Sequence, residues 1–161
     1  MEQAKSQWYI GAPNGVIICV DYRNGCELQG RLYHRFSAEP VDFTDLGQMT
    51  LLMERLYDDL RFPFSGTNER SFSESESKLQ TRQERKEQMS DDKLLQKHGD
   101  IGTFIVRVQH RQNSSWQGRI TWMEEDKTIC FRSVWEMVKL IESAMDTVSV
   151  SEDGQEPKWG D

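Results

Sequence analysis

"WQGRITW" at Trp116–Trp122 has a counterpart, "LQGRLYH" at Leu28–His34, 88 residues earlier in the chain. Both contain Gln-Gly-Arg, and the match extends without a gap from residues 16–60 to residues 104–148. Ordinary composition would give roughly three identical positions over such a length. Eleven are identical: Ile17/Ile105, Val20/Val108, Arg23/Arg111, Gln29/Gln117, Gly30/Gly118, Arg31/Arg119, Phe43/Phe131, Met49/Met137, Leu52/Leu140, Glu54/Glu142 and Asp58/Asp146. The sequence therefore predicts an internal duplication.

Each copy begins with three predicted strands. Residues 16–23 and 104–111 are rich in β-branched and aromatic residues, and their alternating polarity predicts a strand with one buried face. A polar turn leads to a second strand at 28–34 or 116–122, whose central glycine is expected to make room for a helix. A short third strand ends at Phe43 or Phe131.

A helix follows the strands in each copy. Asp45 with Gln48, and Ser133 with Glu136, have the spacing of an N-cap residue and its N3 partner. Apolar residues then recur at helical spacing to residue 60 or 148. A β-β-β-α unit of this size buries too little to be stable alone. We therefore expect an α+β fold in which two pseudo-symmetric units form one compact body, with antiparallel sheets and helices on one face.

The other segments differ in composition from the two copies. Residues 1–15 form an N-terminal segment, and repeat 1 extends over 16–72 because an aromatic-rich docking loop follows its helix. Residues 73–100 are mostly Ser, Gln and charged residues, which predicts a flexible linker or a marginal solvated helix. Repeat 2 occupies 101–148, and an acidic, disordered tail is expected over 149–161.

Composition limits the classes of function. The 161-residue chain is 36% hydrophobic with a net charge of -7, and it contains no apolar run long enough for a membrane span. Three cysteines without ligand spacing fit a reducing compartment, and we expect a cytoplasmic protein without a metal or cofactor. His34, His98 and His110 lie on a strand face, in the linker and at a strand end, so no catalytic constellation is visible. We expect no enzymatic activity.

The predicted outer face of the sheet is basic although the chain is acidic. This face is predicted to carry six arginines and one acidic residue, Asp21. Arginine suits phosphate contacts and glutamine can bond to base edges, so the face predicts a regulatory protein that binds single-stranded DNA or RNA. The predicted binding residues are Arg23, Gln29, Arg31, Arg107, Arg111, Gln117 and Arg119. Two alternatives remain: these side chains solvate the sheet, or they pair with acids of the other repeat.

A second hypothesis places the function on the helices, which are acidic. Glu54, Asp58, Glu142 and Asp146 would then mimic phosphate and bind a basic nucleic-acid-binding protein. The chain would be an adaptor, or an inhibitor of a nucleic-acid-handling machine. The sequence does not set the oligomeric state, and a homo-oligomer remains open.

Two resemblances bear on these hypotheses. Strand meanders followed by a helix, in two copies, resemble the PUR and Whirly families, and that resemblance implies binding of single-stranded nucleic acid on the sheet. Those repeats have four strands, and no residue motif here matches theirs. The segment "RVQHRQNSSWQGRITW", followed by "FRSVWEMVKLIESA", is similar to small uncharacterised bacterial proteins, which implies a bacterial cytoplasmic origin and no particular activity.

Overall fold

The two longest strands, β1 (Gly15–Asn24) and β4 (Gly102–Gln112), pair in antiparallel orientation at the centre of one sheet. β2 (Glu27–His34) and β3 (Val41–Phe43) continue the sheet beyond β1, while β5 (Ser115–Trp122) and β6 (Lys127–Phe131) continue it beyond β4. The strand order is β3-β2-β1-β4-β5-β6. This computed structural model describes residue 10 and residues 15–25, 27–60, 87–112 and 115–152, which form a single α+β body.

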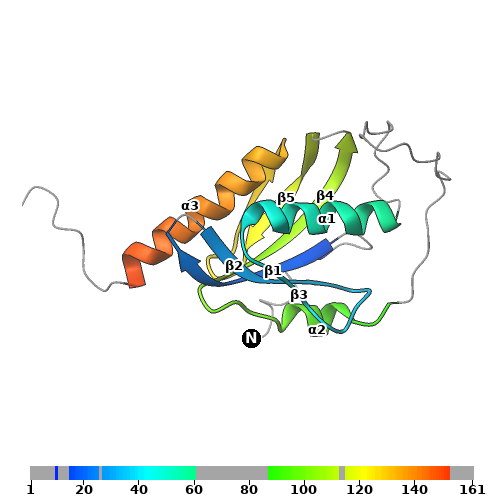
Figure 1. Ribbon diagram of the computed structural model, residues 1–161, viewed down its shortest axis with the longest axis horizontal. Coiled ribbons are helices and arrows are strands. Elements are labelled where there is room, and N and C mark those ends of the chain that lie inside the picture. Colours follow the sequence, from blue (N-terminus) through cyan, green and yellow to red (C-terminus); the bar gives the residue numbers. More distant parts are fainter. Residues whose placement is uncertain (1–9, 11–14, 26, 61–86, 113–114, 153–161) are drawn as a thin grey trace, which may run out of the picture.

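Two helices, α1 (Leu46–Leu60) and α3 (Val134–Glu152), cover the same face of the sheet (Figure 1). Both begin with the predicted capping residues. The backbone N–H of Gln48 donates to Asp45 Oδ1 at 2.7 Å, and that of Glu136 donates to Ser133 Oγ at 3.0 Å. Because α3 continues to Glu152, residues 149–152 are helical although disorder was expected from residue 149, and the rest of the tail lies outside the described residues.

The main core lies between the sheet and these two helices. The inward faces of β1 and β4 contribute β-branched and aromatic side chains, and the helices contribute mainly methionine and leucine. Trp116 of β5 is 2% exposed and packs edge-on against Tyr57 of α1, so the two halves of the chain share one core. The residues with complete or near-complete burial include Val16, Ile18, Phe104, Val106, Met49, Met53, Met137 and Met145.

Both central strands contain a β-bulge at corresponding positions. The register shifts between Val20 and Tyr22 in β1 and between Val108 and His110 in β4. A Cβ atom on Gly30 would overlap the backbone carbonyl of Cys19 in the adjacent strand, and Gly118 meets that of Arg107 in the same way. These glycines therefore make room for a neighbouring strand, and the expectation that they admit a helix was wrong.

Residues 87–100, here called the cover segment, lie on the opposite face of the sheet, which we call the outer face. The segment contains the short helix α2 (Asp91–Leu95) (Figure 1). It buries Leu94 and Met89 against Ile17, Cys19 and Ile105. These contacts give residues 87–100 more structure than the flexible linker expected over 73–100, and residues 73–86 lie outside the described part. Ile17 and Ile105 point to the outer face, where other residues of the same chain bury them.

Within the described residues, no helix has both the length and the apolar character needed to cross a membrane.

Candidate nucleic-acid interface

Arg23 and Arg111 do not lie on the outer face, so the prediction that they belong to a nucleic-acid-binding surface on that face was wrong. Each follows a bulge, and the extra residue reverses the alternation of side chains. Arg23 is consequently paired with Leu28, and Arg111 with Trp116, both of which belong to the helix-side core.

On the helix side, each of these arginines forms an ion pair with the helix from the other half of the chain. Arg23 Nη2 is 2.6 Å from Asp146 Oδ1 of α3, and Arg111 Nη1 is 2.8 Å from Asp58 Oδ1 of α1. The alternative in which arginines pair with acids of the other repeat therefore describes these two positions. Asp58 and Asp146, two of the four acidic residues that the second hypothesis places on the helices, are therefore the partners in these ion pairs.

The two ion pairs differ in their exposure to water. The Arg111 side chain is 3% exposed and its guanidinium lies over the Tyr57 ring, 5.5 Å from the centroid, whereas the Arg23 side chain is 28% exposed. Burial also raises the pKa of the Tyr57 hydroxyl. Arg111 is thus a core residue, whereas Arg23 forms a partly exposed ion pair at the surface.

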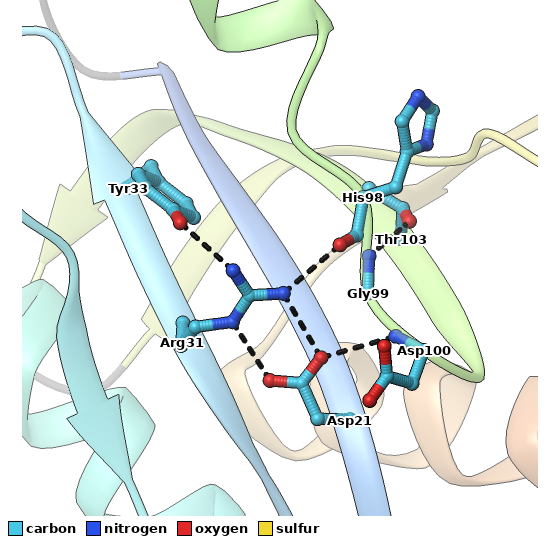
Figure 2. A network of polar contacts seen from close by, with 7 residues as sticks. All are labelled: Asp21, Arg31, Tyr33, His98, Gly99, Asp100 and Thr103. Carbon is cyan, nitrogen blue, oxygen red and sulfur yellow. Dashed lines mark hydrogen bonds and ion pairs between the residues drawn. The ribbon is translucent and has the colours of Figure 1, made fainter.

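Arg31 lies on the outer face as predicted, but internal contacts occupy its guanidinium group (Figure 2). Nε and Nη2 donate to the two carboxylate oxygens of Asp21 at 2.7 and 2.9 Å. Nη1 donates to the Tyr33 hydroxyl at 2.8 Å, and Nη2 also donates to the carbonyl of His98 at 2.9 Å. The hydrogen bonds to Asp21 raise the pKa of Arg31, as expected for a charge-assisted bidentate pair.

This network fixes the cover segment to β1 and β2. Asp21 Oδ1 also accepts a hydrogen bond from the backbone N–H of Asp100 at 3.0 Å (Figure 2). Arg35, whose side chain is 8% exposed, forms an ion pair with Asp91 at 2.8 Å that lacks hydrogen-bond geometry. The carbonyl of Arg35 accepts from the N–H groups of Gln88 and Met89. The outer face over β1 and β2 is consequently covered by the chain's own cover segment, and we call it the covered half.

The outer face over β4, β5 and β6 has a different character, and we call it the open surface. Its side chains are those of Arg107, Gln109, His110, Gln117, Arg119, Thr121, Thr128 and Cys130. Arg107 is half-buried, and Arg119 and the two glutamines are exposed. Gln29, the counterpart of Gln117 on β2, is half-buried at the margin of the covered half.

Charge distinguishes the open surface from the covered half. The position of Asp21 is taken by Gln109 in the aligned copy, and the sequences of β4, β5 and β6 contain no Asp or Glu. Arg107 lies directly opposite Arg119 on the neighbouring strand. Two arginines at opposed positions concentrate positive charge on this part of the sheet. The structure therefore brings together Arg107, Arg119 and Gln117 and separates them from Arg23 and Arg111.

Sequence reasoning missed the bulges and the role of the cover segment. Strict alternation along residues 16–23 and 104–111 would put Tyr22 and His110 in the core, yet Tyr22 is 57% exposed and His110 is also exposed. A histidine at an expected core position was the available signal for a bulge. The network around Arg31 had no signal in sequence spacing, because His98 and Asp100 reach it from a segment without a counterpart in the repeat.

The remaining acidic residues of the second hypothesis lie on the helices. Glu54 is half-buried on α1, and Glu142 is exposed on α3. In the described ranges, no three His, Cys, Asp or Glu side chains are placed so that they could hold a metal ion.

Comparisons with protein-family models, with curated proteins and with solved structures find no match to this chain. The open surface is accordingly interpreted from its own geometry.

Proposed function

We propose that this chain is a non-enzymatic binding protein that engages single-stranded nucleic acid on the open surface. The observation that carries the proposal is the opposed pair Arg107 and Arg119, which lies on three strands without an acidic residue in a chain of net charge -7. A surface of this kind attracts an anion locally although the whole molecule is acidic.

The side chains around the arginines suit nucleic acid better than a simple anion. Gln109 and Gln117 offer amide donors and acceptors to base edges, while the arginines contact phosphate. His110 is exposed at the end of the surface and provides a ring on which a base can stack. Only two or three phosphates fit this set, so binding should be weak and the logarithm of its constant should fall with a slope of about -1.4 to -2 against log salt.

The test is a binding titration with short single-stranded DNA and RNA oligonucleotides at several salt concentrations. Arg119→Glu and Arg107→Glu should each reduce affinity by roughly tenfold or more, because a reversed charge repels phosphate. Arg55→Glu is the matched control, since Arg55 is an exposed arginine on α1, on the other side of the sheet. Absence of binding at low salt, or equal losses for Arg55→Glu and Arg119→Glu, would contradict the proposal.

The proposal includes the architecture of two β-β-β-α copies related by a pseudo-two-fold axis. Three observations support it. The β1–β4 register places Ile17 opposite Ile105, its aligned counterpart. The bulges occur at aligned positions, and so do the two ion pairs, Arg23–Asp146 and Arg111–Asp58. A single axis between Ile17 and Ile105 accounts for all three.

We place this function in the reducing environment of the cytoplasm. Cys19 is a buried free thiol and Cys130 an exposed one, which suits a compartment that keeps thiols reduced. The adaptor or inhibitor hypothesis has less support, because Asp58 and Asp146 already balance arginines of their own chain.

A further inference from the structure

The two edges of the sheet differ in their protection against pairing with another strand. β3 has only three residues, follows Pro40, and carries the exposed Asp42 at its centre. Short length, proline and a central charge all discourage edge-to-edge pairing. β6 has five residues, of which the first four are exposed, and its only charge is Lys127 at the start. Among the residues that the structure describes, no strand pairs with the outer edge of β6.

We propose that β6 pairs in antiparallel orientation with β6 of a second copy of this chain, about a two-fold axis at Ile129. This register sets Thr128 opposite Cys130 of the second copy and Lys127 opposite Phe131, so no like charges meet within the strands. Just outside the strand, the pairing brings Asp126 of the β5–β6 turn close to Arg132 of the second copy, and symmetry forms this opposite-charge pair twice. The edge is thus complementary to itself in charge.

The axis also accounts for an exposed apolar side chain. Ile129 is 49% exposed, and its pairing with Ile120 places it on the helix side of the sheet. At the two-fold axis, the two Ile129 side chains lie opposite each other, at the short Cβ–Cβ separation typical of directly paired residues. Each would cover the apolar surface of the other.

Arg132 is available to a second copy. Its side chain is 84% exposed, and its contact with Glu136 in the same chain is long, 3.7 Å between Nη2 and Oε2. Because β3 is protected, only one edge of each chain pairs, and the assembly closes as a dimer instead of growing into a filament. The resulting sheet would place two open surfaces side by side, but the dimer itself does not depend on nucleic-acid binding.

The first experiment is sedimentation equilibrium of the full chain without nucleic acid. It should give a reversible dimer, with twice the 18.9 kDa mass of one chain. Ile129→Lys puts two ammonium groups together at the axis and should weaken the dimer by roughly 10- to 100-fold. Asp42→Lys, which places the same ammonium group on the β3 edge, is the control and should leave the dimer unchanged. Far-ultraviolet circular dichroism establishes that each variant is folded.

A charge test addresses the register. Asp126→Asn should weaken the dimer by roughly threefold to tenfold, and so should Arg132→Glu, which opposes two carboxylates. In the Arg132→Glu background, however, Asp126→Asn should strengthen the dimer because it removes that repulsion. Asparagine also tolerates the positive φ of 53° at position 126. Within one chain the two positions are separated by six residues, about 20 Å of strand, so the reversal of sign requires contact between copies.

Three results would overturn the inference. One is a chain that stays monomeric up to roughly 100 μM, where even weak specific association is detected. Another is an oligomer that Ile129→Lys leaves intact. The third is an Asp126→Asn substitution that weakens the dimer equally in both backgrounds, which would remove the proposed register.

Discussion

Arg23 and Arg111 show how one residue type at aligned positions can contribute differently to stability. Both follow a bulge, and both pair with an aspartate of a helix from the other half. Asp58 and Asp146 are both more than half exposed, so water solvates the acid in either pair. The difference lies in the arginines, because only Arg111 is enclosed by the core and stacked on Tyr57. Its alkyl stem and guanidinium group therefore contribute packing as well as charge.

Arg111→Ala is expected to lower the free energy of unfolding by about 2 kcal/mol, because it removes a buried side chain from the Tyr57 ring. Arg23→Ala removes an exposed ion pair and should cost less than about 1 kcal/mol. Urea denaturation of the two variants measures the difference. Equal losses would show that burial does not distinguish the two positions.

At the scale of elements, the strands and helices were predictable to within a few residues because each has a strong local pattern. The capping pairs Asp45/Gln48 and Ser133/Glu136 set the helix starts, and alternation identified β1, β2, β4 and β5. The bulges were not predictable from alternation, since one extra residue changes the face of everything after it. Two of the seven predicted binding residues, Arg23 and Arg111, were therefore assigned to the wrong side of the sheet, while Arg107 and Arg119 were assigned to the correct side.

The cover segment escaped prediction for a different reason. Its composition is that of a solvated linker, and only Met89, Leu94 and Leu95 carry apolar contacts to the sheet. Such contacts depend on an apolar patch that exists only after β1, β2 and β4 have paired. Local sequence does not contain that information, because the patch draws on residues distant in the chain.

Leu94→Asp should release the cover segment, since Leu94 is fully buried and a carboxylate does not remain in an apolar site. In the wild-type protein Cys19 should resist alkylation at pH 8, because burial raises its thiol pKa from 9.0 to about 12. The variant should label at Cys19, as measured by peptide mass spectrometry. Lys93→Ala changes an exposed neighbour and serves as control, and the exposed Cys130 should label in every variant. Unchanged protection of Cys19 in Leu94→Asp would argue against docking by Leu94.

At the scale of the whole molecule, the α+β class and the single body followed from size and pattern. A segment of about 45 residues buries too little to form a sufficient core, so the two predicted units were expected to share one. The structure meets this requirement through the β1–β4 pairing and through contacts such as Tyr57 with Trp116. The pattern did not predict that the cover segment would pack on the outer face, because this packing depends on tertiary contacts.

The stability of the molecule should decrease at alkaline pH. Burial raises the pKa of Cys19 on the outer face and of Tyr57 on the helix side, so the folded protein holds two protons that the unfolded chain releases above about pH 9. The stabilisation from each group is complete below its unfolded pKa and is lost as pH rises toward the folded value. Urea titrations at pH 8 and pH 10 should show a lower free energy of unfolding at pH 10.

Single substitutions separate the two contributions to this pH dependence. Cys19→Ala and Tyr57→Phe should each make the decline shallower, whatever their effect on stability at pH 8. A slope that neither substitution alters would assign the alkaline sensitivity to other groups.

If the chain consists of two repeats as proposed, the cover segment also explains how the two become unlike. A chain made of two similar units has a single connection between them, and that connection can settle on only one of two related surfaces. Here it settles against Ile17, Cys19 and Arg31, which leaves Gln117 and Arg119 exposed to solvent. Connectivity alone thus breaks the symmetry of the proposed architecture. Because the covered outer face and the open surface have different neighbours, their sequences can then diverge. The difference between Asp21 and Gln109 is an example.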